Sequence, residues 1–153
     1  MPHIHERVDF AADVLIVHKN KVLLRKHDKY KIWLGVGGHI EPDEDPNQTA
    51  VREAKEEVGL DVTLVGSVKD FAGTKGDKDL LPPRFINRHR INEIHEHVSM
   101  IYFATTKSTK IIQGENEVSD EIRWFTREEL DDPQFGVGER MQYYAKKALE
   151  AVQ

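Results

Sequence analysis

Three glutamates and one arginine lie close together in the middle of the chain, at Arg52, Glu53, Glu56 and Glu57. The spacing of Glu53 from Glu56 and Glu57 brings all three carboxylates onto one face of an α-helix. Such a face is locally unfavourable, because like charges repel and the last turn carries the negative end of the helix dipole. A hard divalent cation such as Mg2+ or Mn2+ would convert this repulsion into coordination. The alternative is a solvated acidic surface, which is the commoner meaning of a charge run.

The residues around this cluster carry complete start and stop signals for a helix. Asp45 is a favoured N-cap residue, and Pro46 and Gln48 suit the first and third helical positions after it. Gly59 stands where a left-handed residue ends many helices. We therefore predict a helix over residues 46–58. Its expected apolar stripe consists of Ala50, Val51, Ala54 and Val58.

The segment from Gly38 to Leu60 resembles the Nudix box in every fixed position. The matching residues are Gly38, Glu44, Arg52, Glu53, Ala54, Glu56, Glu57, Gly59 and Leu60. Ala54 is small for its aliphatic position, and Val36-Gly37-Gly38 stands where the family usually has Pro-Gly-Gly. Arg123-Trp124-Phe125, followed by Glu128-Glu129-Leu130, is similar to the late strand and turn of many Nudix domains. A match of this length is far more specific than an isolated glycine motif.

The resemblance implies an α/β/α sandwich with a curved mixed β-sheet, formed as a single Nudix hydrolase domain over residues 1–153. It also implies a pyrophosphohydrolase that cleaves a phosphoanhydride bond in a nucleoside diphosphate linked to another moiety, with nucleoside triphosphates slightly favoured. Glu53, Glu56 and Glu57, with the backbone carbonyl of Gly37, would hold Mg2+ (or Mn2+), and Arg52 would orient the glutamates. The alternative is a non-catalytic Nudix-like nucleotide-binding or sensor domain, against which the intact glutamates argue.

The general base is expected to be a further carboxylate. Glu117, in the stretch before Trp124, is the first choice, and Glu115, Glu121 or a glutamate of the box are the alternatives. Glu44 is expected to act as a secondary metal ligand or as a hydrogen-bonding group. A Nudix-fold isopentenyl diphosphate isomerase would need an active-site cysteine, and the chain has none.

Gly38, His39, Arg84 and Arg88 are the expected substrate-binding residues. A glycine allows the backbone to approach a ligand closely. Arg84 and Arg88 belong to a basic patch that includes Phe85, His89 and Arg90, in a predicted long loop over residues 73–92. The alternative is a loop that only aids solubility.

The histidines suggest a second metal site. His95 and His97 share one face of a predicted strand, and His89 is close in sequence, so that three imidazoles could bind zinc. Packed or hydrogen-bonded histidines are the commoner case.

The elements that must position these residues follow from hydrophobic periodicity. Strands are predicted over residues 8–18, 21–27, 32–34, 36–40, 60–68, 94–105 and 122–125. A C-terminal helix is predicted from one apolar stripe, formed by Met141, Tyr144, Ala145, Ala148 and Val152.

Composition narrows the class of protein. With 153 residues the chain is about one domain long, and its net charge of −5 argues against a nucleic-acid partner. Its longest apolar run, Met100 to Ala104, is too short to cross a membrane. The lack of cysteine and of an apolar signal segment favours a cytoplasmic location. A small-molecule nucleotide is the expected partner, and a homodimer is an open alternative to a monomer.

Overall fold

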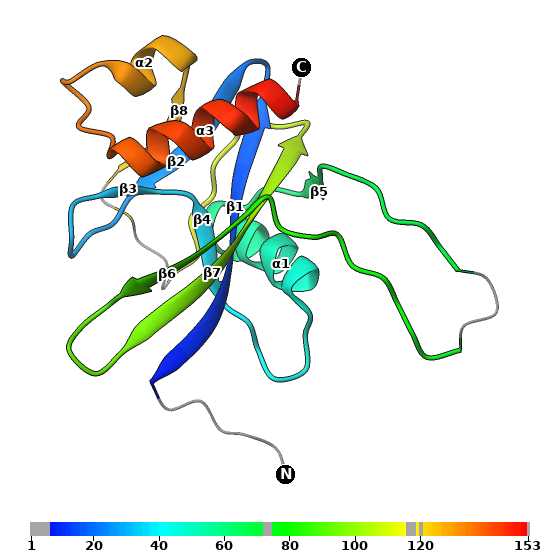
Figure 1. The fold of residues 1–153 in the computed structure, drawn as a ribbon. Helices are drawn as coiled ribbons and strands as arrows, with labels where there is room; N and C mark the ends of the chain where they lie inside the picture. The colour runs from blue at the N-terminus through cyan, green and yellow to red at the C-terminus, as the bar shows by residue number, and fades with distance from the viewer. Residues whose placement is uncertain (1–6, 72–74, 116–118, 120, 153) are drawn as a thin grey trace.

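The computed structural model describes residues 7–71, 75–115, 119 and 121–152 (Figure 1). The strands in this part of the chain are β1 Val8–His18, β2 Lys21–Lys26, β3 Trp33–Leu34, β4 Val36–His39, β5 Val62–Leu64, β6 Phe85–Arg90, β7 Glu96–Thr106 and β8 Glu121–Phe125. The helices are α1 Pro46–Val58, α2 Arg127–Asp131 and α3 Glu139–Ala151. None of these helices has the length and apolar character that a membrane crossing needs.

The strands form one mixed sheet that forks along β1. β1 pairs with β7 in parallel, whereas the other pairings are antiparallel. On its other edge β1 pairs with β4 through residues 11–14 and with β2 through residues 17–18. β2 then continues away from β1 to pair with β3 and β8. The change of partner separates β2 from β4 and leaves space between the two branches.

Each face of the sheet is covered by a helix, as Figure 1 shows. Alternation along β1 sends Leu15 and Val17 to one apolar cluster, and Val14 and Ile16 to the other. The first cluster includes the α3 residues Tyr144, Ala145, Ala148 and Leu149. The second includes the α1 residues Ala50, Ala54 and Val58. The predicted α/β/α sandwich with a mixed sheet is therefore confirmed.

Helix α1 begins and ends where the sequence predicts. Asp45 caps it by accepting a hydrogen bond from the Gln48 backbone N–H, and the Gln48 side chain accepts one from the Asp45 N–H in return. Gly59 ends the helix with a φ of 71°, a left-handed conformation that favours glycine. The predicted apolar stripe of α1 is wrong at Val51, which is 41% exposed. The buried face instead includes Glu53 and Glu57, since β4 packs against that side of α1.

The prediction of a loop over residues 73–92 is wrong in its second half. Residues 85–90 form β6, which pairs along the first half of β7 in antiparallel register. The strand has only a weak apolar alternation of its own, so its sequence does not indicate it. Pairing with β7 supplies the backbone hydrogen bonds that define it. β5 is shorter than predicted, at three residues.

Candidate active site

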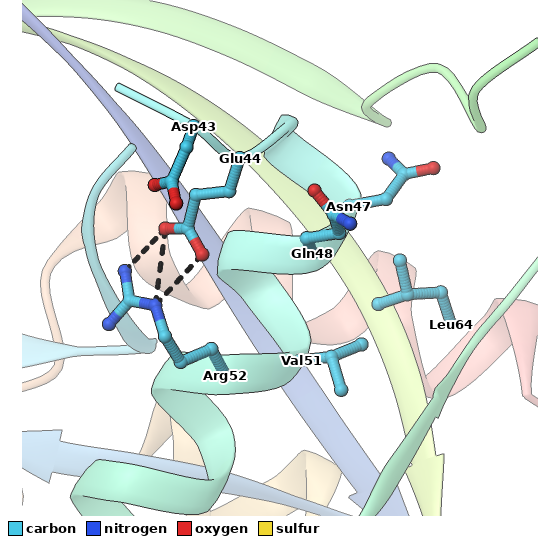
Figure 2. Close-up of a pocket in the computed structure, with 7 residues that line it drawn as sticks. All are labelled: Asp43, Glu44, Asn47, Gln48, Val51, Arg52 and Leu64. Atoms are coloured by element: carbon cyan, nitrogen blue, oxygen red, sulfur yellow. Dashed lines mark hydrogen bonds and ion pairs between the residues drawn. The ribbon is translucent and has the colours of Figure 1, made fainter. Parts of the chain in front are cut away.

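Arg52 is the centre of an ion-pair network at the first half of α1. Its Nη2 atom donates to Oε1 of Glu44 at 2.6 Å, and its Nε atom donates to Oε2 of the same carboxylate at 3.0 Å (Figure 2). Its Nη1 atom donates to Glu53 at 2.9 Å and to Glu56 at 3.0 Å. Nη2 also reaches the backbone carbonyl of His39 at 3.2 Å. One guanidinium thus links the loop before α1, the end of β4 and two box glutamates.

Glu44 acts as a hydrogen-bonding group in this network. It accepts from Arg52 and, at 2.8 Å, from the hydroxyl of the buried Thr49. The hydrogen bonds from Arg52 are the main reason that the pKa of Glu44 falls to about 2, and the Thr49 and Glu41 contacts add to the shift. Glu44 is therefore ionised at neutral pH and holds Arg52 in one orientation.

Glu53 and Glu57 are buried, whereas the Glu56 side chain is 53% exposed. Both buried carboxylates lie against β4. The backbone N–H of Gly37 donates to Oε2 of Glu57 at 3.3 Å, and Nε of Arg25 lies 3.1 Å from the same oxygen. At Gly38, an added Cβ would come within 2.2 Å of Oε1 of Glu53. Glycine at this position therefore allows the Glu53 carboxylate to touch the backbone of β4.

Asp13 lies against Gly37 on the face of the sheet opposite to Glu53, and sequence reasoning did not single it out. It is opposite Gly37 in the β1–β4 register, and a Cβ on Gly37 would lie 2.0 Å from its Oδ1. Burial raises the pKa of Asp13 to about 6, although a hydrogen bond with Ser99 and the charge of Arg25 oppose the shift. The available signal was an acidic residue between the apolar residues 10–12 and 14–17 of β1.

A cavity of about 710 Å³ opens beside Asp13, between the two branches of the sheet. Gly38 and His39, two of the residues predicted to bind substrate, are among those that line it. Its basic lining residues are Arg25, Arg90 and Arg140, and its aromatic ones include Tyr30, Trp33 and Tyr144. A separate, shallower hollow of about 600 Å³ lies outside α1, lined by Asp43, Glu44, Asn47, Gln48, Val51, Arg52 and Leu64 (Figure 2). We assign the candidate site to the larger cavity, because Asp13, Gly37 and Gly38 are among its lining residues and both glycines contact box glutamates. The residues Arg52, Glu53, Glu56 and Glu57 do not themselves line it.

The structure does not bring Arg84 or Arg88 into this cavity. The Arg88 side chain is 60% exposed and pairs with Glu96, with Nε 2.9 Å from Oε2. Arg84 lies over the ring of Phe103, at 5.3 Å from its centroid. Side chains alternate along β6, so Asn87 and His89 face the cavity, while Arg88 and Arg90 point to the outer side with Glu96. Arg90 therefore borders the cavity only at the end of the strand.

The structure describes two of the three loop glutamates considered as the general base. Glu117 lies outside the described residues. Glu115 and Glu121 are both exposed. Ser119, two residues after Glu117, is buried and accepts a hydrogen bond from Nη1 of Arg25 at 3.2 Å.

The side chains that come together are not the three histidines that the sequence predicts. His95 and His97 lie beside His39 and Asp9, so that one ligand atom from each is within 4.8 Å of the others. His89 instead bonds through Nδ1 to Oδ1 of Asn87 at 2.9 Å. Burial, followed by the charges of neighbouring histidines, lowers the pKa of His97 to about 4.

Comparison with known proteins confirms the resemblance. A family model described as the NUDIX domain matches residues 8–146, and the chain therefore belongs to the Nudix hydrolase family. A solved structure of a NUDIX-family hydrolase from Clostridium perfringens is 34% identical and superposes with a TM-score of 0.86. That match covers 98% of this chain and 100% of the other.

Two curated relatives match over shorter segments. CTP pyrophosphohydrolase from Escherichia coli (strain K12) is 37% identical over 54 residues, which are 33% of this chain and 40% of that protein. Dihydroneopterin triphosphate diphosphatase from Haemophilus influenzae is 49% identical over 45 residues, 29% of this chain and 28% of that protein. The matched segments thus span less than half the length of these relatives.

Proposed function

We propose that this chain is a Mg2+-dependent pyrophosphohydrolase that cleaves a phosphoanhydride bond of a nucleotide, with a nucleoside triphosphate or a similar triphosphate as the favoured substrate. The observation that carries the proposal is the contact of two buried glutamates, Glu53 and Glu57, with the Gly37–Gly38 backbone at the wall of a large cavity. Both curated relatives are named for activity on a triphosphate, which supports this substrate class.

The donor set suits a hard divalent cation. Glu53 and Glu57 offer buried carboxylate oxygens, Glu56 offers an exposed one, and the glycines keep the backbone of β4 open to a ligand. Arg52 lies between Glu53 and Glu56 and pairs with both, which supports a place for positive charge between these carboxylates. We propose Glu53, Glu56 and Glu57, with the Gly37 carbonyl, as the residues that would hold Mg2+ or Mn2+. When bound, the cation would offset the charge of the phosphates and assist attack of water on phosphorus.

The residues of the chain divide the remaining work. Arg52, fixed by Glu44, would keep Glu53 and Glu56 in the orientation that binding requires. Arg25 and Arg140 would bind phosphate oxygens from the cavity wall, because guanidinium groups pair with phosphate through two hydrogen bonds. The aromatic side chains of the cavity would stack on the nucleobase of the substrate. Hydrolysis breaks one bridging P–O bond, joins the water oxygen to phosphorus and passes a proton of the water to the general base.

Glu117 remains the proposed general base, with Glu115, Glu121 or a glutamate of the box as alternatives. The hydrogen bond between Arg25 and Ser119 supports Glu117 and Glu121 alike, since each is two residues from Ser119 in the sequence and Arg25 also pairs with Glu57. We further propose a single domain over residues 1–153 that acts in the cytoplasm on a small molecule. The net charge of −5 and the lack of cysteine support this. Light scattering in solution would distinguish a monomer from a homodimer.

The decisive experiment measures pyrophosphate and phosphate release from a panel of nucleoside triphosphates and other nucleoside diphosphate derivatives, with and without Mg2+. We expect Mg2+-dependent turnover of at least one triphosphate. Glu57→Gln should lower kcat/KM at least about a hundredfold, whereas Glu128→Gln, an equivalent change on the exposed side of α2, should not. Binding of nucleotides without any turnover would favour the non-catalytic alternative.

A further inference from the structure

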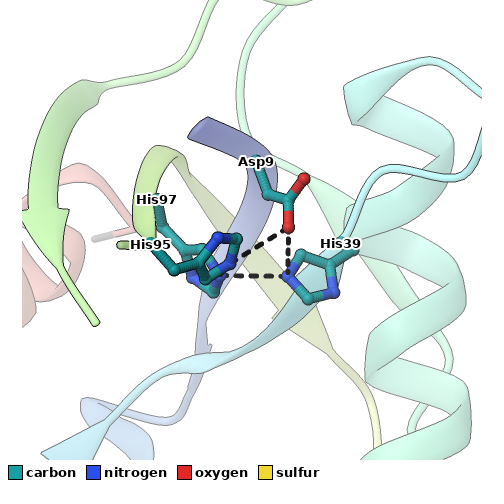
Figure 3. Close-up of side chains that lie close together, drawn as sticks. All are labelled: Asp9, His39, His95 and His97. Carbon is teal, nitrogen blue, oxygen red and sulfur yellow. Dashed lines mark hydrogen bonds and ion pairs between the residues drawn. The ribbon is translucent and has the colours of Figure 1, made fainter. Parts of the chain in front are cut away.

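Four potential metal ligands meet at one end of the sheet, from three segments that are distant in sequence. Asp9 lies in β1, His39 ends β4, His95 immediately precedes β7, and His97 is the second residue of β7 (Figure 3). The pairing of Asp9 with His97 and of Ala11 with His39 brings these side chains to the same face. Figure 3 shows the three imidazole rings and the carboxylate converging on one point.

Four of the six distances between the ligand atoms are 3.0–3.8 Å, near the edge length of a tetrahedron around a small cation, and all six are within 4.8 Å. Nε2 of His97 lies 3.0 Å from Nε2 of His39 and 3.2 Å from Nε2 of His95. Oδ2 of Asp9 lies 3.1 Å from Nε2 of His95 and 3.8 Å from Nε2 of His39. Zinc binds imidazole nitrogen at about 2.0–2.1 Å, which corresponds to ligand–ligand distances of about 3.3–3.4 Å in a tetrahedral site.

Hydrogen bonds alone do not account well for this convergence. Each imidazole nitrogen has one in-plane position, which holds either a proton or a lone pair. Nε2 of His97 nevertheless faces two other imidazole nitrogens, and Nε2 of His95 faces both His97 and Asp9. Two facing nitrogens share one proton at most, so several of these contacts must compete. A cation at the centre would accept one lone pair from each of the four groups.

We propose that Asp9, His39, His95 and His97 form a zinc site. Imidazole suits zinc and its first-row neighbours rather than Mg2+, so this site differs in chemistry from the glutamate site on α1. Four protein ligands complete a tetrahedral shell, which is the pattern of a structural zinc site. Bound zinc would tie together the ends of β1, β4 and β7. It would also stabilise the end of β4, where the His39 carbonyl accepts a hydrogen bond from Arg52.

The test uses the full chain freed of metal with a chelator, then titrated with Zn2+ in excess Mg2+. Calorimetry should find one Zn2+ per chain, and bound Co2+ should give the intense visible absorption of a four-coordinate ion. The melting temperature should rise with Zn2+ by ordinary ligand linkage. Because these measurements need no turnover, they stand apart from the proposed hydrolase activity.

Substitutions of the proposed ligands test where Zn2+ binds. His97→Ala and Asp9→Asn should each weaken Zn2+ binding at least about tenfold. His39→Ala, at a half-exposed side chain, should do the same if His97→Ala alters folding. His89→Ala is the matched control, because it removes an imidazole whose ring lies 5.6 Å from that of His97 but is outside the group. Binding that survives in the Asp9, His39 and His97 variants, binding lost in Glu56→Gln instead, or a six-coordinate Co2+ spectrum would overturn the proposal.

Discussion

Glu44 and Arg52 form a bidentate ion pair across the first turns of α1, with Nη2 of Arg52 2.6 Å from Oε1 of Glu44. The same guanidinium contacts Glu53 and Glu56, so the loop before the helix controls the orientation of the box glutamates. The first prediction follows from this pair.

Glu44→Gln should destabilise the fold by about 1–2 kcal/mol at pH 7, because it removes a charged acceptor from a partly buried arginine. The pKa of Glu44 is lowered to about 2, so its contribution is complete above the unfolded value of 4.5 and is lost as pH falls towards 2. Urea unfolding of both proteins should therefore show a gap that narrows between pH 5 and pH 2. Glu41→Gln, in the same loop but exposed, should show no such gap.

Gly37→Ala should cost more stability than Gly38→Ala. A Cβ at residue 37 would meet the backbone oxygen of Ala12 at 2.6 Å as well as the Asp13 side chain, whereas one at residue 38 would meet only the end of Glu53. We expect about 1–3 kcal/mol for Gly38→Ala and more for Gly37→Ala, measured by urea unfolding. Gly138→Ala, where an added Cβ meets nothing within 4 Å, is the control. Equal costs at residues 37 and 38 would contradict the described packing.

Asp13→Asn should stabilise the metal-free protein at high pH. The pKa of Asp13 is raised from 3.8 to about 6, so the folded state binds the proton more tightly than the unfolded chain. The stability of the wild type should therefore fall as pH rises from about 4 to 6, by about 1–3 kcal/mol. The variant should lack this decline in thermal melts. The control variant Asp28→Asn, which changes an exposed turn residue, should show the same decline in stability as the wild type. Parallel profiles for wild type and Asp13→Asn would contradict the raised pKa.

Arg140→Ala should raise KM for the best substrate by about tenfold, with a smaller change in kcat, because a phosphate contact from the cavity wall acts in the ground and transition states alike. Arg88→Ala is the control, because Arg88 is also an exposed arginine but pairs with Glu96 outside the cavity. Steady-state kinetics would separate the two. A larger KM effect for Arg88→Ala would return substrate binding to the outer face of β6.

Glu117→Gln should lower kcat by about 10²- to 10⁴-fold while leaving Mg2+ affinity nearly unchanged, if Glu117 is the general base. Single-turnover kinetics and calorimetry would measure the two effects separately. The same change at Glu115 and Glu121 provides the comparison, and the largest loss of kcat among the three identifies the base.

The sequence by itself determined α1 and the order of its functional residues. Asp45, Gln48 and Gly59 act on backbone groups within a few positions, so the helix limits are local properties. The spacing of Glu53 and Glu57 likewise places both on one helical face before any tertiary contact forms. The membership of the chain in the Nudix family could therefore be predicted from residues 38–60 alone.

Only the tertiary structure decided which residues meet that helix. Arg25 reaches Glu57, and Asp13 lies against Gly37, because β1 pairs first with β4 and then with β2. Asp9 and His39 join His95 and His97, in place of the predicted His89, through the register of three strands. Arg88 was excluded from the cavity because residues 85–90 pair with β7, and alternation then points its side chain away. Register depends on contacts between distant segments, and a shift by one residue would turn every one of these side chains to the opposite face.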